Sequence, residues 1–239
     1  ELDEALYQRS LSDMAFSGGG LVDHHNTSGF QQGDEPPLVA AFTSTGRGEC
    51  LAFSNDRGRT LTEWEGNPFL AHRGRDPKII WYPEQHKWVM IVYEELGDSP
   101  ASPRGYALYD SPDLKHWRRL SFMPGLFECP ELFRLPLDGR PDDPRWVVYG
   151  ARWEGPRSTC LIGSFDGERF TVQEENAASH YGPHFYAAQI FNNAPDGRVI
   201  MIGWLAGAQY PGMPFSQGMT VPLELSLRST PGGARLCFN

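Results

Sequence analysis

The sequence predicts an all-β protein, and more narrowly a β-propeller made of four-stranded blades. Three hairpin-like segments of similar pattern each end on a large aromatic ring, and these rings recur every 53 residues, at Trp64, Trp117 and Phe170. Strand-like runs rich in β-branched and aromatic residues, such as KWVMIVYEE and RWVVYGAR, precede the hairpins. A period of about fifty residues with four strands per repeat is typical of propeller blades. The periodicity leaves a β-sandwich and a parallel β-helix open as alternatives.

Composition supports short strands and limits the classes of partner. The chain has 26 glycines and 20 prolines among its 239 residues, and both residue types interrupt helices and favour turns. Its length suits one domain over residues 1–239, and we expect no second domain. The formal net charge of -9 argues against nucleic acid as a partner, because phosphate binding requires a basic surface. No apolar run approaches the roughly 18 residues of a membrane-spanning helix, so we expect no membrane partner either.

The cysteines do not indicate a metal site or a disulfide framework. Cys50, Cys129, Cys160 and Cys237 are spread along the chain without a CxxC pair. We therefore expect free thiols. The sequence calls for no metal and no cofactor.

Two acidic residues occupy similar positions in the predicted repeat. In a propeller the first strand of each blade lines the central channel, and the candidate first strands begin near Phe16, Asp76, Glu128 and His184. Asp76, Glu128 and His184 are separated by 52 and 56 residues, which predicts corresponding points of consecutive blades. We therefore expect the two carboxylates to face one axial cavity. Such a pair suits glycoside hydrolysis, in which one group protonates the leaving oxygen and another stabilises a positively charged centre.

The neighbours of the two carboxylates predict different roles. Glu128 is flanked by the apolar Phe127 and Pro130, and such a setting favours the protonated form of a proton donor. Asp76 follows Arg75, whose charge should keep the carboxylate ionised. Taken singly, Asp76 also fits a turn in which its carboxylate caps backbone NH groups, and Glu128 also fits a solvated surface charge.

At these residues the sequence resembles a known family. GRDPKI at residues 74–79 is similar to the Arg-Asp-Pro motif of glycoside hydrolase family 32, and ECPELF at residues 128–133 is similar to its Glu-Cys-Pro motif. FSGGGLVD, YGPHFYAAQ and the stretch from IGWLAG to LELSLR resemble further family segments in the same order. The likeness runs from about residue 5 to residue 230. It implies a five-bladed propeller and an enzyme that releases fructose from sucrose or from fructans such as levan and inulin. Its partners would then be fructose-containing oligo- or polysaccharides.

The resemblance also implies roles for individual residues. Glu128 matches the general acid/base, and Asp76 matches the transition-state stabiliser that holds fructosyl hydroxyls. The residues implied to bind substrate are Phe16, Ser17, Arg75, Cys129, His184, Tyr186 and Trp204. His184 stands where many members have Asp, so contact with sugar hydroxyls and a structural bond within the wall of the site remain alternatives.

The nucleophile is the functional residue that the resemblance does not place. In this family it is an Asp within an Asn-Asp-Pro-Asn type motif on the first strand of the first blade, and no such motif occurs in this sequence. We therefore expect that the first blade is largely missing, that the family's C-terminal β-sandwich is absent, and that the open propeller edge leads to self-association. The resemblance implies a retaining double displacement; a catalytically inactive carbohydrate-binding propeller is the alternative. Because fructan-degrading enzymes of this type are usually exported, it also implies an extracellular or periplasmic location.

Overall fold

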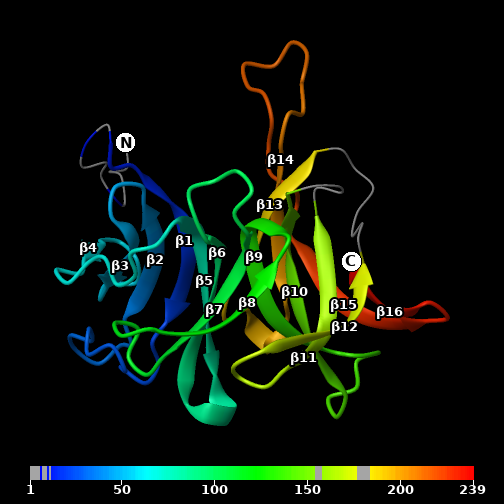
Figure 1. Ribbon diagram of the computed structural model, residues 1–239, viewed down its shortest axis with the longest axis horizontal. Helices are drawn as coiled ribbons and strands as arrows, with labels where there is room; N and C mark the ends of the chain where they lie inside the picture. Colours follow the sequence, from blue (N-terminus) through cyan, green and yellow to red (C-terminus); the bar gives the residue numbers. More distant parts are fainter. Residues whose placement is uncertain (1–5, 7–9, 11, 154–157, 177–183) are drawn as a thin grey trace. The chain divides into compact units, whose positions relative to one another are not determined.

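The chain forms β-sheets almost throughout the residues that the computed structural model describes, which are 6, 10, 12–153, 158–176 and 184–239. These residues form sixteen β-strands and two short 3-10 helices. The chain divides into two compact units, Glu1–Pro124 (unit 1) and Gly125–Asn239 (unit 2). The described strands assemble into four antiparallel sheets of four strands, two in each unit (Figure 1). Within the described parts of the chain, neither helix is long and apolar enough to cross a membrane.

Unit 1 contains two sheets whose strands pair in chain order. The first sheet consists of β1 (Ala15–Val22), β2 (Leu38–Ser44), β3 (Gly48–Ser54) and β4 (Thr62–Glu63). The second consists of β5 (Gly74–Tyr82), β6 (Lys87–Glu95), β7 (Arg104–Ser111) and β8 (Arg118–Pro124), with the 3-10 helix η1 (Pro83–Gln85) between β5 and β6.

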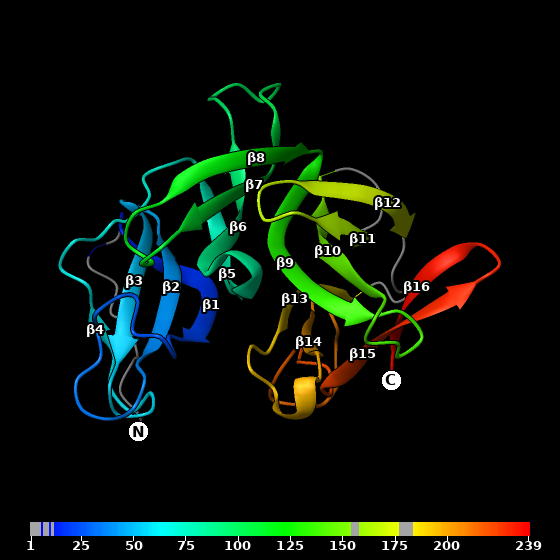
Figure 2. The ribbon, with the colours of Figure 1, turned by 90° about the horizontal axis from the view of Figure 1, so that it is seen from below.

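Unit 2 repeats this arrangement with two further sheets, as Figure 2 shows for β9 to β12. The first of them consists of β9 (Leu126–Pro136), β10 (Pro144–Arg152), β11 (Thr159–Phe165) and β12 (Phe170–Asn176). The second consists of β13 (Phe185–Ile190), β14 (Ile200–Leu205), β15 (Leu223–Thr230) and β16 (Gly233–Phe238), with the 3-10 helix η2 (Pro195–Gly197) between β13 and β14.

The two sheets of unit 1 pack on each other through a shared apolar core. Val39 and Leu51 of the first sheet belong to the same buried cluster as Met90 and Val92 of the second. In β6 all residues between the two ends of the strand are buried, so this strand is covered on both faces, and its residues 88–93 form a continuous apolar run. Burial of each such side chain contributes about 1.5–3 kcal/mol, which makes the inner strands the most stable part of the sheets.

Unit 2 is held together in the same way. Phe133, Val147 and Ile162 of its first sheet share a buried cluster with Met201 and Leu227 of its second. The apolar positions that form each strand are therefore the positions that join neighbouring sheets within a unit.

The predicted all-β architecture and the four-stranded repeat are confirmed. The segments PLVAAFTS, KWVMIVYEE, RWVVYGAR and RVIMIGWLAG form the second strands of the four sheets, β2, β6, β10 and β14. Each sheet has the consecutive antiparallel order of a propeller blade, whereas a β-helix requires parallel pairing. The described residues contain four blades; the fifth blade and the single domain over residues 1–239 stay predictions.

Candidate active site

The first strand of every sheet is interrupted near its start by an irregularity of the β-bulge type. The pairing register shifts at the same stage of each first strand, and the residues that have no one-to-one partner are Ser17 in β1, Asp76-Pro77 in β5, Glu128–Pro130 in β9 and Ala187-Ala188 in β13. Bulges re-aim side chains and are frequent next to active sites. The shared repeat position of Asp76 and Glu128 therefore has a structural counterpart, since each stands on the bulge of its own first strand.

Several of these bulge residues have a left-handed backbone. The φ angles are 65° at Asp76, 37° at Glu128, 52° at Cys129 and 48° at Ala187. For residues other than glycine this conformation costs roughly 1–2 kcal/mol, and it persists where the surrounding contacts fix it. Such residues concentrate at functional sites, which agrees with the roles predicted for Asp76 and Glu128.

The expectation that His184 corresponds to Asp76 and Glu128 in the repeat is wrong. His184 lies before the first residue of β13, and the bulge of that strand falls on Ala187 and Ala188 instead. Nδ1 of His184 lies 2.8 Å from the carbonyl oxygen of Ala206, whose own N–H donates to the His184 carbonyl at 2.8 Å. These paired contacts tie His184 to the residue that follows β14, and contact between His184 and substrate stays a prediction.

In unit 1 the predicted residues gather at the start of β1 and β5. Phe16 and Ser17 are exposed, Phe16 by 43% of its surface. Arg75 and Asp76 are half-buried, and the Arg75 guanidinium lies over the Tyr93 ring at 4.9 Å from its centroid. Phe16 and Arg75 line a pocket of about 390 Å³, together with the β2–β3 turn and residues 71–74. A volume of this size fits a small sugar.

A buried polar network lies behind Asp76. The Asp76 N–H donates to the Thr43 hydroxyl oxygen at 3.1 Å, and the Thr43 hydroxyl donates to Oε2 of Glu49 at 2.8 Å. Oε1 of Glu49 lies 2.8 Å from Nε2 of His72, and Nδ1 of His72 lies 3.6 Å from Oε1 of Glu94. The His72 side chain, 6% exposed, is therefore enclosed between two buried carboxylates.

This enclosure changes the ionisation of His72 and Glu94. Burial alone would lower the pKa of His72, but its hydrogen bond to Glu49 and the charges of Glu49 and Glu94 raise the pKa to about 9. Burial would raise the pKa of Glu94, but contacts with His72, Arg119 and Tyr109 outweigh it and lower the pKa to about 2. At neutral pH the network therefore contains an imidazolium ion facing a carboxylate.

In unit 2 the predicted acid/base lies beside a tyrosine. The hydroxyl of Tyr186 donates to Oε2 of the half-buried Glu128. Tyr186 pairs across the sheet with Trp204, whose ring centroid is 6.5 Å away, and 39% of the Trp204 surface is exposed. A carboxyl group fixed by a phenol, with an exposed indole nearby, is suited to protonate a glycosidic oxygen of a sugar that stacks on the ring.

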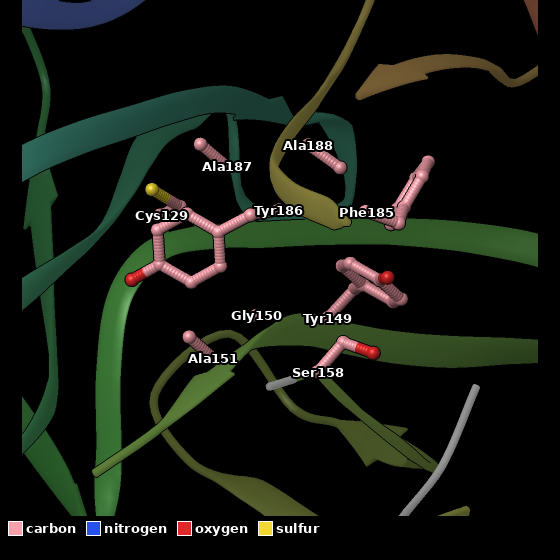
Figure 3. A pocket seen from close by; sticks show the side chains of 9 residues that line it. All are labelled: Cys129, Tyr149, Gly150, Ala151, Ser158, Phe185, Tyr186, Ala187 and Ala188. Atoms are coloured by element: carbon pink, nitrogen blue, oxygen red, sulfur yellow. The ribbon is translucent and has the colours of Figure 1, made fainter. Parts of the chain in front are cut away.

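Cys129 lines a small pocket among β9, β10 and β13. Figure 3 shows Cys129 and Tyr186 on one side of this pocket, and Tyr149, Ser158 and Phe185 on the other. Its free volume of about 10 Å³ admits about one water molecule and no sugar ring. Contact between Cys129 and substrate stays a prediction.

The structure groups the predicted residues into two sets. Phe16, Ser17 and Arg75 lie with Asp76 in unit 1, whereas Tyr186 and Trp204 lie with Glu128 in unit 2. The prediction that Asp76 and Glu128 face one cavity connects the two units and stays a prediction.

Sequence reasoning missed the buried pair of Glu49 and His72 behind the first set. Glu49 is a charged residue inside the apolar strand β3, which signals a buried polar contact, but its partner His72 belongs to a distant segment. Trp153 is 54% exposed and packs edge-to-face against Phe127 at 4.8 Å, beside Glu128. Among the described residues, no group of three or more His, Cys, Asp or Glu side chains is arranged to hold a metal ion.

The profile of the glycosyl hydrolases family 32 N-terminal domain matches residues 1–238. This chain belongs to glycosyl hydrolase family 32. A levanase of Bacillus subtilis (strain 168) is 37% identical over 265 residues, covering 98% of this chain and 38% of the levanase. An extracellular exo-inulinase of Aspergillus ficuum is 32% identical over 275 residues, covering 93% of this chain and 50% of the inulinase. The solved exo-inulinase from Aspergillus awamori superimposes with a TM-score of 0.83 at 29% identity, covering 98% of this chain and 55% of that one.

Family membership confirms the resemblance read from the motifs. The family 32 relatives are named levanase, exo-inulinase and invertase, all of them glycoside hydrolases. The four sheets described above are accordingly four blades of a β-propeller. The chain spans about half or less of the length of these curated relatives.

Proposed function

We propose that this chain contributes the catalytic propeller of a hydrolase that releases fructose from sucrose, levan or inulin. The observation that carries the proposal is the placement of the two family motifs, because Asp76 and Glu128 each occupy a bulge with a left-handed backbone at the start of a first strand. The names of the relatives agree with substrates of this class. Since one relative is named an extracellular exo-inulinase, we further propose an extracellular location.

In the proposed reaction Glu128 acts as the general acid/base. It donates its proton to the glycosidic oxygen as the bond to the fructosyl carbon breaks, and a carboxylate nucleophile takes up the fructosyl group. In the second half-reaction Glu128 removes a proton from the water that displaces this carboxylate, so the product retains its configuration. We assign no residue of this sequence to the nucleophile.

The neighbouring side chains support these two steps. The Tyr186 hydroxyl fixes the orientation of Glu128, and Trp204 offers its exposed face to the sugar. Asp76 accepts hydrogen bonds from fructosyl hydroxyls, while Phe16 and Arg75 border the pocket in unit 1 that holds part of the substrate.

The proposal is tested by measuring fructose release from sucrose, levan and inulin. The assay uses the natural polypeptide that contains this chain and its Glu128→Gln variant, with the exposed Glu168→Gln as the matched control. We expect Glu128→Gln to lower kcat by about 10²–10⁴-fold and Glu168→Gln to leave it unchanged. Equal activity of Glu128→Gln and the wild type would refute the assignment. If the protein binds levan without hydrolysing it, the proposed function is wrong and the protein is a carbohydrate-binding propeller. An inverted product anomer in NMR spectra would exclude the double displacement.

A further inference from the structure

The buried network of unit 1 ends on the backbone of Asp76, not on another side chain. Its members come from β2, β3, β6, β7 and β8 and from the segment before β5, and they include the buried Thr43, Glu49, Glu94 and Tyr109. Polar groups are costly to bury, so a connected chain of them that reaches a bulge calls for a role beyond packing.

From this geometry we infer that Thr43, Glu49 and His72 form a positioning relay that fixes Asp76. The inference rests on the proposed function, in which the Asp76 carboxylate holds the fructosyl group. Thr43 and His72 also border the pocket of unit 1. In this inference the three relay residues act through the backbone of Asp76.

The directions of the hydrogen bonds make the relay specific. A hydroxyl has one hydrogen, and Thr43 donates it to Glu49 at 2.8 Å. The lone pairs of the Thr43 oxygen then face the Asp76 N–H, which donates to it at 3.1 Å. Glu49 is fully buried, and its other carboxyl oxygen is 2.8 Å from Nε2 of His72. His72 therefore fixes Glu49, Glu49 fixes the Thr43 hydroxyl, and the hydroxyl fixes the bulge.

His72 is itself held from its other sides. Glu94 faces its Nδ1, and Glu94 accepts hydrogen bonds from the Tyr109 hydroxyl at 2.9 Å and from Arg119 at 2.7 Å. The ring also packs against Gly74, where an added Cβ would lie 2.5 Å from Cε1 of His72. Because Gly74 precedes Arg75 and Asp76 in β5, displacement of the ring disturbs the strand that carries both residues.

The experiment compares four variants of the natural polypeptide that contains this chain. Thr43→Val keeps the shape of the side chain and removes the hydroxyl, and Thr43→Ser restores it. Asp76→Asn measures what the carboxylate itself contributes. Thr60→Val removes an exposed hydroxyl of the same unit, which donates to the turn residue Asp56. His72→Gln is added as a fifth variant once its folding is verified by circular dichroism.

Two quantities are measured, and only the first of them depends on catalysis. The first is kcat and KM for sucrose; the second is hydrogen exchange of the Asp76 amide, followed by NMR. We expect Thr43→Val to lower kcat about tenfold with a smaller change in KM, and to accelerate exchange of the Asp76 amide about tenfold. His72→Gln should change both quantities in the same direction. Thr43→Ser and Thr60→Val should match the wild type in both.

The outcomes separate the relay from the proposed function. If Asp76→Asn abolishes hydrolysis while Thr43→Val retains wild-type kcat and Asp76 exchange, the relay is refuted and the proposed function stands. If Asp76→Asn leaves hydrolysis intact, or no hydrolysis is found, the proposed role of Asp76 fails. The amide exchange then decides the relay alone: faster exchange in Thr43→Val with recovery in Thr43→Ser supports it, and unchanged exchange overturns it.

Discussion

Replacement of His72 by glutamine should flatten the dependence of stability on alkaline pH. The His72 ring lies between Glu49 and Glu94, and these carboxylates raise its pKa from 6.5 to about 9 against the opposing effect of burial. A raised pKa in the folded state means that the stabilisation is fully present below about pH 6.5 and is lost as pH rises through about 9. At about 1.4 kcal/mol for each pKa unit, the loss over this window amounts to about 2–3 kcal/mol.

The assay is urea unfolding at constant temperature, followed by tryptophan fluorescence between pH 6.5 and 9. We expect the free energy of unfolding of the wild type to fall by this amount across the window, and that of His72→Gln to start lower and change little. His116→Gln serves as the control, because the His116 side chain is 83% exposed and its Nδ1 contacts the nearby Asp113, which is not a member of the buried network. If the free energy of unfolding declines equally in the wild type and in His72→Gln, another group titrates in this range. That result would refute the conclusion that His72 is a protonated, enclosed imidazole at neutral pH.

Three further substitutions test the geometry of the two sets of residues. Gly74→Ala should destabilise the protein by about 3 kcal/mol or more in urea unfolding, because the added Cβ would lie 2.0 Å from the Tyr93 carbonyl oxygen. In the control Gly20→Ala the added Cβ meets no atom within 4 Å, so the free energy of unfolding should change by no more than about 0.5 kcal/mol. Tyr186→Phe removes the donor to Glu128 and should lower kcat about tenfold; an unchanged kcat would contradict a role for this contact in catalysis. Trp204→Ala should raise KM for inulin several-fold through loss of stacking, and equal KM values would remove this ring from the site.

The sequence was sufficient to predict the second strands and to place Asp76 and Glu128 near the start of two first strands. Runs such as KWVMIVYEE are rich in β-branched and aromatic residues and therefore favour a buried strand, and this run is β6 to the residue. The repeat also placed Asp76 and Glu128 at equivalent points, because both lie on the first strand of a sheet that has the same strand order.

The failures have identifiable physical reasons. The bulges depend on how two strands pair, and pairing is a property of partners that are remote in sequence. The predicted repeat position of His184 was wrong because the bulge of β13 falls on Ala187 and Ala188, small apolar residues that carry no chemical signal. Contact between Glu49 and His72 was not predictable either, because the two residues are 23 positions apart and neither occurs in a recognisable pattern.

The bulges also indicate positions at which this protein accepts amino-acid substitution. A residue inserted into a strand without a cross-strand partner contributes nothing to the ladder, so its side chain is replaced without disturbing the pairing on either side. Ser17 and Ala187 occupy such positions in two blades, next to Phe16 and Tyr186. Mutational libraries aimed at a new sugar preference therefore have a natural starting point at the exposed Ser17, whereas the left-handed backbone of Ala187 (φ 48°) restricts the residues that this position accepts.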